Sequence, residues 1–188
     1  MLIRLKSLSA LTINSVAVFS VTTAVAQSAT YFIVLFYAGL AEAGQFALYV
    51  AISGVTSALI RPQFWMYLGL KDVDDYQRQL YQDSTIQKLA TIILLPPVLA
   101  LTTSLSALTI GCVTFYSATY NCNFVNYKIR FEHKYGSVVQ LNFVSVIVKV
   151  VIITLWTGAP HLMVLAFLAL DAALWSTLYL YFMPKKQQ

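Results

Sequence analysis

Long apolar segments are the feature that most constrains the fold of this 188-residue chain. A helix needs about 20 apolar residues to cross a hydrocarbon core of roughly 30 Å, and several segments have that length and almost no charge. Hydrophobic residues make up 59% of the chain and charged residues 10%, against about 25% charged in an ordinary soluble domain. The sequence therefore predicts an all-α, polytopic membrane protein.

The apolar pattern predicts one transmembrane domain over residues 1–188, built from three helical hairpins. Its six spans are expected at residues 9–37, 44–60, 89–103, 106–127, 138–156 and 162–183. The first is too long for an upright helix and is expected to tilt. The third is short, and Pro96 and Pro97 predict a break or kink in it. The polar stretch 61–88 is expected to be a solvated interfacial segment that is helical over its second half.

The basic residues predict the orientation, because Lys and Arg stay on the cytoplasmic side during insertion. With the N-terminus inside, all of the 12 basic residues except Lys149 fall at cytoplasmic ends or connections. The opposite connections, around "AEAG", "TTS" and "TGAPH", contain neither Lys nor Arg. Both termini are therefore expected in the cytoplasm.

A second interpretation of the N-terminus stays open. "MLIRLK", an apolar stretch and "AVAQ" together resemble a secretory signal with a small-x-small cleavage site at Ala24 and Ala26. Cleavage there would leave an apolar remainder too short to span and would spoil the alternation of loop charge. The uncleaved interpretation is favoured, and mature protein beginning at Gln27 would overturn it.

The remaining composition argues against several classes of function. The formal charge of +5 is explained by insertion and by anionic membrane lipids as partners, so no nucleic-acid partner is expected. Cys112 and Cys122 lie about 15 Å apart along one helix, too far for a disulfide. His133 and His161 fall on opposite sides of the membrane, so no metal set is expected. Without a phosphate loop or nucleophile elbow, we expect no enzyme and no cofactor.

Two charged residues lie within the last two spans. Lys149 is about 18 Å from the cytoplasmic end of the fifth span, and Asp171 is roughly 15 Å from the opposite end of the sixth. Because the two spans form an antiparallel hairpin, these side chains could face one another. An unpaired charge at a helix centre costs about 2.5 to 3.5 kcal/mol, so pairing is the economical arrangement.

The pair has two interpretations that the sequence leaves open. It is an ion pair that only fixes the register of the hairpin, or it lies on a hydrated cavity wall. In the second case Lys149 attracts an anionic substrate group, and Asp171 is a protonation or cation-coupling site.

Polar residues also recur at helical spacing on three spans. The fifth span carries such a stripe at Asn142, Ser145, Lys149 and Trp156. The fourth carries one at Tyr116, Tyr120, Asn123, Tyr127 and Arg130, and the first carries one at Ser20, Thr23, Gln27 and Thr30. The stripes on the fourth and fifth spans are candidates for lining a substrate cavity, with helix–helix hydrogen bonding as the alternative. The first stripe is expected to pack against protein.

Two segments resemble a known family. In "AEAGQFALYVAISGVTSALIRPQF", the Gly44, Phe46, Ala47, Leu48 and Arg61 positions are similar to those that open and close the second helix of Wzx-type polysaccharide flippases. These flippases belong to the multidrug/oligosaccharidyl-lipid/polysaccharide exporter superfamily. "YKIRFEHKYGSVVQLNFVSVIVKVVIIT" resembles the cytoplasmic turn before their fifth helix, with Arg130 and Glu132 at the matching polar positions.

The resemblance implies the N-terminal lobe of an O-antigen flippase in a bacterial inner membrane. Its substrate would be a polyprenyl-diphosphate-linked oligosaccharide for lipopolysaccharide or other polysaccharide biosynthesis, and its diphosphate would be the anion at Lys149. Family members join two such lobes around the cavity, so a homodimer or a second half-flippase chain is expected as partner. The alternatives are a non-transporting membrane scaffold or assembly subunit and a small cation or drug exporter of the same superfamily.

Overall fold

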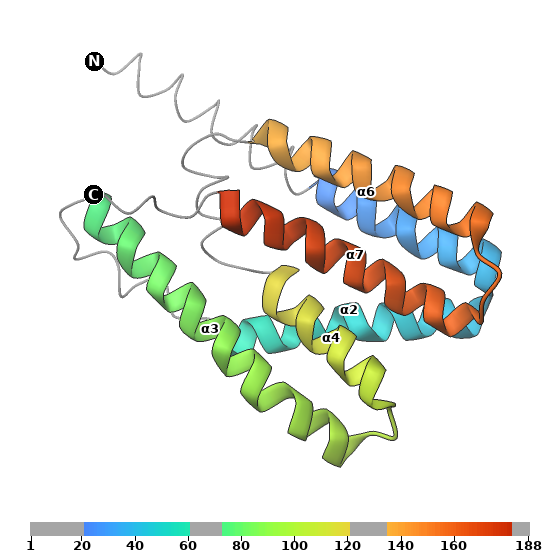
Figure 1. The fold of residues 1–188 in the computed structure, drawn as a ribbon, viewed down its shortest axis with the longest axis horizontal. Helices are drawn as coiled ribbons and strands as arrows, with labels where there is room; N and C mark the ends of the chain where they lie inside the picture. The colour runs from blue at the N-terminus through green and yellow to red at the C-terminus, as the bar shows by residue number, and fades with distance from the viewer. Residues whose placement is uncertain (1–20, 61–72, 121–134, 182–188) are drawn as a thin grey trace.

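The computed structural model describes residues 21–60, 73–120 and 135–181, with side chains from Gln79 in the second range and Gly136 in the third. This part of the chain is entirely helical (Figure 1). Its elements are an N-terminal helix (Val21–Ala38), α2 (Leu40–Ile60), α3 (Val73–Thr102), α4 (Ala107–Tyr120), α6 (Tyr135–Leu155) and α7 (Pro160–Tyr181). The predicted all-α fold is confirmed for the described residues.

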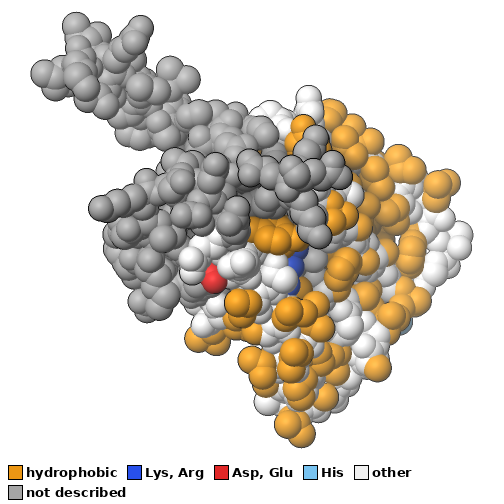
Figure 2. Space-filling model, turned by 60° about the vertical axis from the view of Figure 1, so that its left-hand side comes forward, with side chains coloured by type: hydrophobic (Ala, Val, Ile, Leu, Met, Phe, Trp, Pro, Cys, Tyr) orange, Lys and Arg blue, Asp and Glu red, His pale blue; other side chains and the backbone are white. Residues whose placement is uncertain are grey.

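Five of these helices are long and apolar enough to cross a membrane. The described part of α4 has 14 residues and is too short to be judged by the same measure. Large apolar side chains also lie on the outside, and Figure 2 shows hydrophobic groups over most of the described part of one face. So apolar a surface is typical of contact with lipid rather than with water. The chain is thus a multi-pass membrane protein, and its described residues form helices joined by short turns.

Short connections join the helices into antiparallel pairs. Gly39 has a φ of +100°, a left-handed conformation that glycine adopts without steric cost, and it alone separates the N-terminal helix from α2. At the start of α4, the Ser106 hydroxyl accepts the backbone N–H of Thr109 at 3.3 Å as an N-cap. Between α6 and α7, the Trp156 indole N–H donates to the Ala159 carbonyl at 3.2 Å. These connections all lie towards the right of Figure 1.

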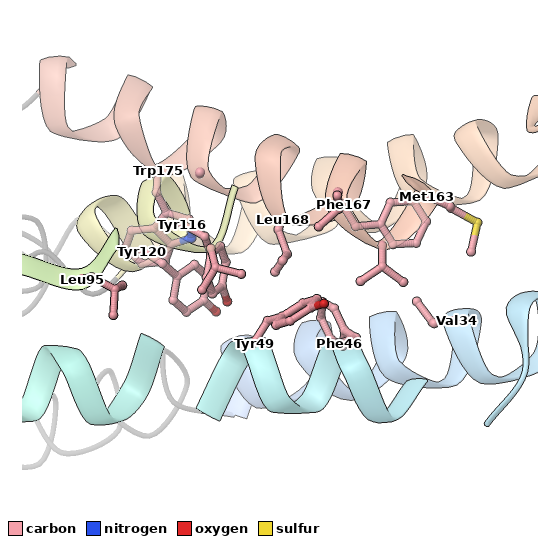
Figure 3. Packing of buried hydrophobic residues seen from close by; sticks show 14 of the residues in the cluster. Val34, Phe46, Tyr49, Leu95, Tyr116, Tyr120, Met163, Phe167, Leu168 and Trp175 are labelled. Carbon is pink, nitrogen blue, oxygen red and sulfur yellow. The ribbon is translucent and has the colours of Figure 1, made fainter. Parts of the chain in front are cut away.

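The packed interior lies around α7 and α4. Helix α4 contacts α2, α3 and α7, while α6 contacts α7 on its other side. Four α7 side chains, those of Val164, Phe167, Leu168 and Ala172, are completely buried. Figure 3 shows Phe167 and Leu168 pointing towards Tyr49 and Phe46 of α2. Helices that are apolar on their outer surface therefore enclose this interior.

The third span was expected to be short and to break or kink at its prolines, and its short length and the break were wrong. Helix α3 has 30 residues and begins at Val73, and it contains Pro96 and Pro97 without interruption. Proline removes hydrogen bonds inside a helix, but such residues are tolerated in membrane helices because neighbouring groups satisfy the freed carbonyls. The helical second half of the stretch 61–88 is confirmed, whereas its solvation is not, because Leu80, Ser84 and Gln87 are buried on one face.

The other boundaries differ from the prediction by a few residues. The second span was expected from residue 44 and begins at Leu40, and the fifth and sixth begin at Tyr135 and Pro160 rather than at 138 and 162. Residues 9–20, 121–127 and 182–183 of the predicted spans lie outside the described residues. The cytoplasmic location of the termini stays a prediction, because the basic connections 61–72 and 121–134 are also outside them.

A matched pair of leucines tests this packing. We expect Leu168→Ala to lower the free energy of unfolding by about 2 kcal/mol or more, because it opens a cavity at a fully buried site. Leu101→Ala removes the same atoms from a side chain that is 87% exposed and should change stability little. Thermal unfolding of both variants in detergent measures the difference. Equal losses would contradict the placement of α7 at the centre.

Candidate functional site

A buried ion pair joins the middle of α6 to the middle of α7. The Lys149 ammonium donates to Asp171 Oδ2 at 2.7 Å. Lys149 is only 2% exposed, and the Asp171 side chain keeps 13% of its surface accessible. The predicted proximity of the two charged residues across the α6–α7 hairpin is confirmed.

Two hydroxyl groups complete the surroundings of this pair. Lys149 Nζ also donates to Thr30 Oγ1 of the N-terminal helix at 3.0 Å. Thr30 is 1% exposed, and its own hydroxyl donates to the Ala26 carbonyl at 2.9 Å. On the other side, the Ser145 hydroxyl donates to Asp171 Oδ1 at 2.7 Å. Both carboxylate oxygens and two of the three ammonium donors therefore have partners within the protein.

The polar cluster continues along the N-terminal helix towards α4 and the start of α6. Asn142 Nδ2 lies 3.4 Å from Thr23 Oγ1, at the long end of hydrogen-bond distance. The Gln27 amide donates to the Tyr120 hydroxyl at 3.0 Å. The Tyr120 ring stacks on Tyr116 at 4.8 Å between centroids and lies 5.0 Å from the Trp175 ring. Four helices thus contribute to one cluster, which we call the Lys149 cluster: Thr23, Gln27, Thr30, Tyr120, Asn142, Ser145, Lys149, Asp171 and Trp175.

Sequence spacing brings these groups together. On α6, Asn142, Ser145 and Lys149 follow at intervals of three and four, which puts them on one face of the helix. On the N-terminal helix, Thr23, Gln27 and Thr30 follow at intervals of four and three. The two polar faces therefore have the same length and lie against one another. Their side chains form hydrogen bonds to other helices in place of hydrogen bonds to water.

A small cavity lies within the Lys149 cluster. It measures about 10 Å³ and is lined by Gln27, Asn142, Lys149 and Asp171 among others. This volume is close to the minimum for one water molecule, and the polar lining supplies the partners that a buried water needs. In this arrangement the cluster can hold a water beside the ammonium, but it has no room for a diphosphate.

No protein-family model, curated protein or solved structure matches this chain. The argument for function therefore depends on the geometry of the site and on the residue patterns described above.

The structure brings some of the predicted site residues together and separates others. Lys149, Asp171, Ser145, Asn142 and Tyr120 belong to the Lys149 cluster, and Tyr116 is buried beside it. Their assignment to a substrate cavity stays a prediction. Three further residues of the predicted fourth-span stripe lie outside the described residues: Asn123, Tyr127 and Arg130.

Trp156 does not continue the α6 stripe. Helix α6 ends at Leu155, and the Trp156 indole closes the following turn instead. The expected continuation assumed that the helix extended through residue 156. Because the chain leaves the helix one residue earlier, the periodicity no longer predicts where this side chain lies.

The sequence prediction missed the role of the first polar stripe at the charged pair. Thr23, Gln27 and Thr30 were expected to pack against protein, which is confirmed, because each bonds to a residue of another helix. Their common partner was not predicted. A usable signal was the matched spacing of the two stripes, since an apolar helix that carries a polar face needs a polar neighbour in the membrane.

The charged pair makes a strong prediction for stability. We expect Lys149→Met to lower the free energy of unfolding by about 3–5 kcal/mol, because it leaves Asp171 buried and unpaired. Combining it with Asp171→Leu should recover most of the loss, since an apolar pair needs no partner. Thermal unfolding in detergent measures both. A double variant as unstable as the single variant would contradict this account of the pair.

A smaller effect is expected at Thr30. Replacing it by valine keeps the shape and removes one acceptor from the ammonium, so Thr30→Val should cost about 1 kcal/mol. Thr177→Val is the matched control, because Thr177 is exposed and its hydroxyl bonds only within its own helix. If the two variants unfold at the same temperature, the Thr30 contact contributes nothing measurable.

Proposed function

We propose that this chain is a half-length flippase lobe of a bacterial inner membrane, with both termini in the cytoplasm. It moves a polyprenyl-diphosphate-linked oligosaccharide across the membrane for polysaccharide biosynthesis, together with a second lobe. The second lobe is another copy of the chain or a separate half-flippase chain, arranged about a two-fold axis.

The observation that carries this proposal is the Lys149 cluster. Ionisable residues in the middle of membrane helices are costly, and they commonly mark pathways for substrates and ions. Lys149 lies in α6 and Asp171 in α7, the two helices of highest mean hydropathy among those that could span a membrane. Polar groups of the N-terminal helix and α4 lie around this pair. The ion pair alone would be enough to fix the register of α6 and α7. Gln27, Tyr120 and Asn142 are not needed for that purpose. The additional polar groups support a role in transport.

The closed geometry gives the cluster a definite role in the proposed cycle. Asp171 and Thr30 occupy the ammonium in the described state. A diphosphate therefore binds Lys149 only after Asp171 has separated from it, which couples substrate binding to a movement between α6 and α7. Tyr120 and Trp175 lie beside the more accessible carboxylate, and the same movement would expose their buried rings to the sugar.

A second candidate is a membrane scaffold or assembly subunit that transports nothing. It is favoured by the closure of the cluster, because both oxygens of Asp171 are bonded and the cavity is only about 10 Å³. In a scaffold, the ion pair contributes only the attraction between α6 and α7. It does not matter which of the two helices carries the positive charge.

Export assays distinguish the two candidates. In a strain that depends on this protein for glycan export, we expect Lys149→Ala and Asp171→Ala each to abolish export. The apolar double variant Lys149→Met with Asp171→Leu should reach normal membrane levels and still export nothing. Gln140→Ala, at an exposed position of α6, is the control and should export normally.

The charge exchange gives the sharpest outcome. Lys149→Asp combined with Asp171→Lys preserves the attraction but moves the positive charge to α7. A flippase should stay inactive, because the ammonium no longer meets the diphosphate. Recovery of function by this exchange would establish the scaffold. Normal export by both single alanine variants would contradict a functional role of the Lys149 cluster, whether the chain is a flippase lobe or a scaffold.

A further inference from the structure

Tyr179 connects the end of α7 to α3. Its hydroxyl lies 3.0 Å from Thr85 Oγ1, and it is the donor, because the Thr85 hydroxyl has one hydrogen and donates it to the Tyr81 carbonyl at 2.9 Å. The Tyr179 ring stacks on the Tyr81 ring at 5.6 Å between centroids. The Lys88 ammonium lies 2.9 Å from the centroid of the Tyr179 ring. One α7 side chain thus makes three directional contacts with one face of α3, which we call together the Tyr179 contact.

The same half of α3 carries polar side chains on its buried face. Ser84, Gln87 and Thr91 follow at intervals of three and four and are 1%, 7% and 2% exposed. The Oε1 atom of Gln87 has no hydrogen-bond partner among the described residues. Burial of such an atom is costly, and the cost disappears when the atom meets water. This half of α3 is therefore held in place at a cost that contact with water would remove.

The distribution of such atoms distinguishes α3 and its neighbours from the rest of the bundle. Among the described residues, the buried side-chain atoms that lack a partner belong to Ser53 of α2, Gln87 of α3, and Thr114 and Ser117 of α4. No member of the Lys149 cluster is among them. Helix α3 packs on α2 and α4, so the unpartnered atoms all lie on three helices that contact one another. Polar satisfaction thus favours closure at the Lys149 cluster and separation around α3.

Pro96 and Pro97 divide α3 into two parts. Because proline has no N–H, the helix lacks two of the backbone hydrogen bonds that would otherwise cross this point, and it bends there more easily. On the C-terminal side, Leu99 is 5% exposed and anchors the helix in the bundle, and a short turn joins it to α4. The longer N-terminal part, which carries Gln87, has its connection to α7 at the Tyr179 contact.

Helix α3 lies at one edge of the described bundle (Figure 1), and open grooves flank it at the two prolines. One groove lies between α3 and α2, measures about 500 Å³ and includes Leu94 and Val98 in its lining. The other lies between α3 and α4, measures about 660 Å³ and includes Pro96 and Pro97. Leu94 and Val98 are more than half exposed. The helix can therefore bend at the prolines without displacing a packed neighbour.

We propose that residues 73–95 of α3 form an arm that bends at Pro96 and Pro97, and that the Tyr179 contact holds this arm closed. When the contact breaks, the arm moves away from α7, and water reaches its polar face at Ser84 and Gln87. Loss of the Tyr179 contact opposes opening, whereas hydration of Gln87 favours it. The movement does not depend on the proposed flippase activity. It opens the bundle at the membrane face where α7 ends.

Labelling of a thiol on the arm of the full chain tests this movement. In a background in which Cys112→Ala and Cys122→Ala remove the native thiols, Ser84→Cys places a thiol on the buried face of α3 with little change in shape. The reagent is a charged, membrane-impermeant methanethiosulfonate. It reacts with thiolates in water, so the labelling rate follows the fraction of open protein. In phosphatidylcholine nanodiscs, we expect Tyr179→Phe to raise this rate about fivefold, because it removes one hydrogen bond of the closed position.

Three control variants separate the movement of the arm from other effects. Tyr37→Phe is the matched substitution at a side chain that is 67% exposed, and it should leave the rate unchanged. Leu168→Cys places the thiol at a fully buried position of α7 and should stay unreactive with or without Tyr179→Phe. Pro96→Ala combined with Pro97→Ala restores the missing backbone donors, so it should reverse the acceleration.

The outcomes separate an arm from its alternatives. If Ser84→Cys is labelled equally fast with and without Tyr179→Phe, the Tyr179 contact holds nothing closed, and the proposal is overturned. If Leu168→Cys reacts at the accelerated rate, the whole bundle loosens, which also overturns it. An acceleration that persists with alanine at positions 96 and 97 would contradict bending there. Acceleration that is confined to Ser84→Cys and reversed by the two alanines would support the arm.

Discussion

The contact between Lys149 and Asp171 is the interaction on which the arrangement of the bundle depends. A charge within a membrane helix needs a partner at its own depth, and here that partner lies 2.7 Å away on the next helix. This requirement fixes α6 and α7 in one register. Thr30 extends the same constraint to the N-terminal helix, because it accepts a hydrogen bond from the same ammonium. Three helices are thus aligned by one charged group and its acceptors.

Apolar packing explains how the remaining helices join this unit. Helix α7 presents Asp171 to one neighbour and Phe167 and Leu168 to the interior, so it is the element that both charged and apolar contacts share. Lipid is as apolar as leucine, so close packing and polar contacts, rather than escape from water, hold such helices together. Helix α4 contributes Tyr120 to the Lys149 cluster and also packs against α2 and α3. It therefore connects the Lys149 cluster to the two helices that contribute nothing to it.

The sequence predicted a large part of this structure, for identifiable reasons. The helical class followed from the length of the apolar segments, and the Lys149–Asp171 contact followed from depth along an antiparallel hairpin. The continuity of α3 did not follow, because the sequence predicted an interfacial helix before residue 89 and a separate short span after it, whereas one helix runs from Val73 to Thr102. Burial of Ser84 and Gln87 depends on the helices that cover them, and periodicity alone does not supply those neighbours.

The sequence by itself determined that this chain is helical, that it is built for a membrane, and that its two intramembrane charges lie at matching depths. Those properties depend on composition and on distance along the chain, and both can be read directly from the order of the residues. Only the tertiary structure decided that Thr30 and Ser145 close the pair and that Gln27 meets Tyr120. Each of these is a contact or a burial between residues of different helices or turns, and its existence depends on how helices are rotated and spaced. That rotation is set by side-chain packing, which the order of the residues along one helix does not specify.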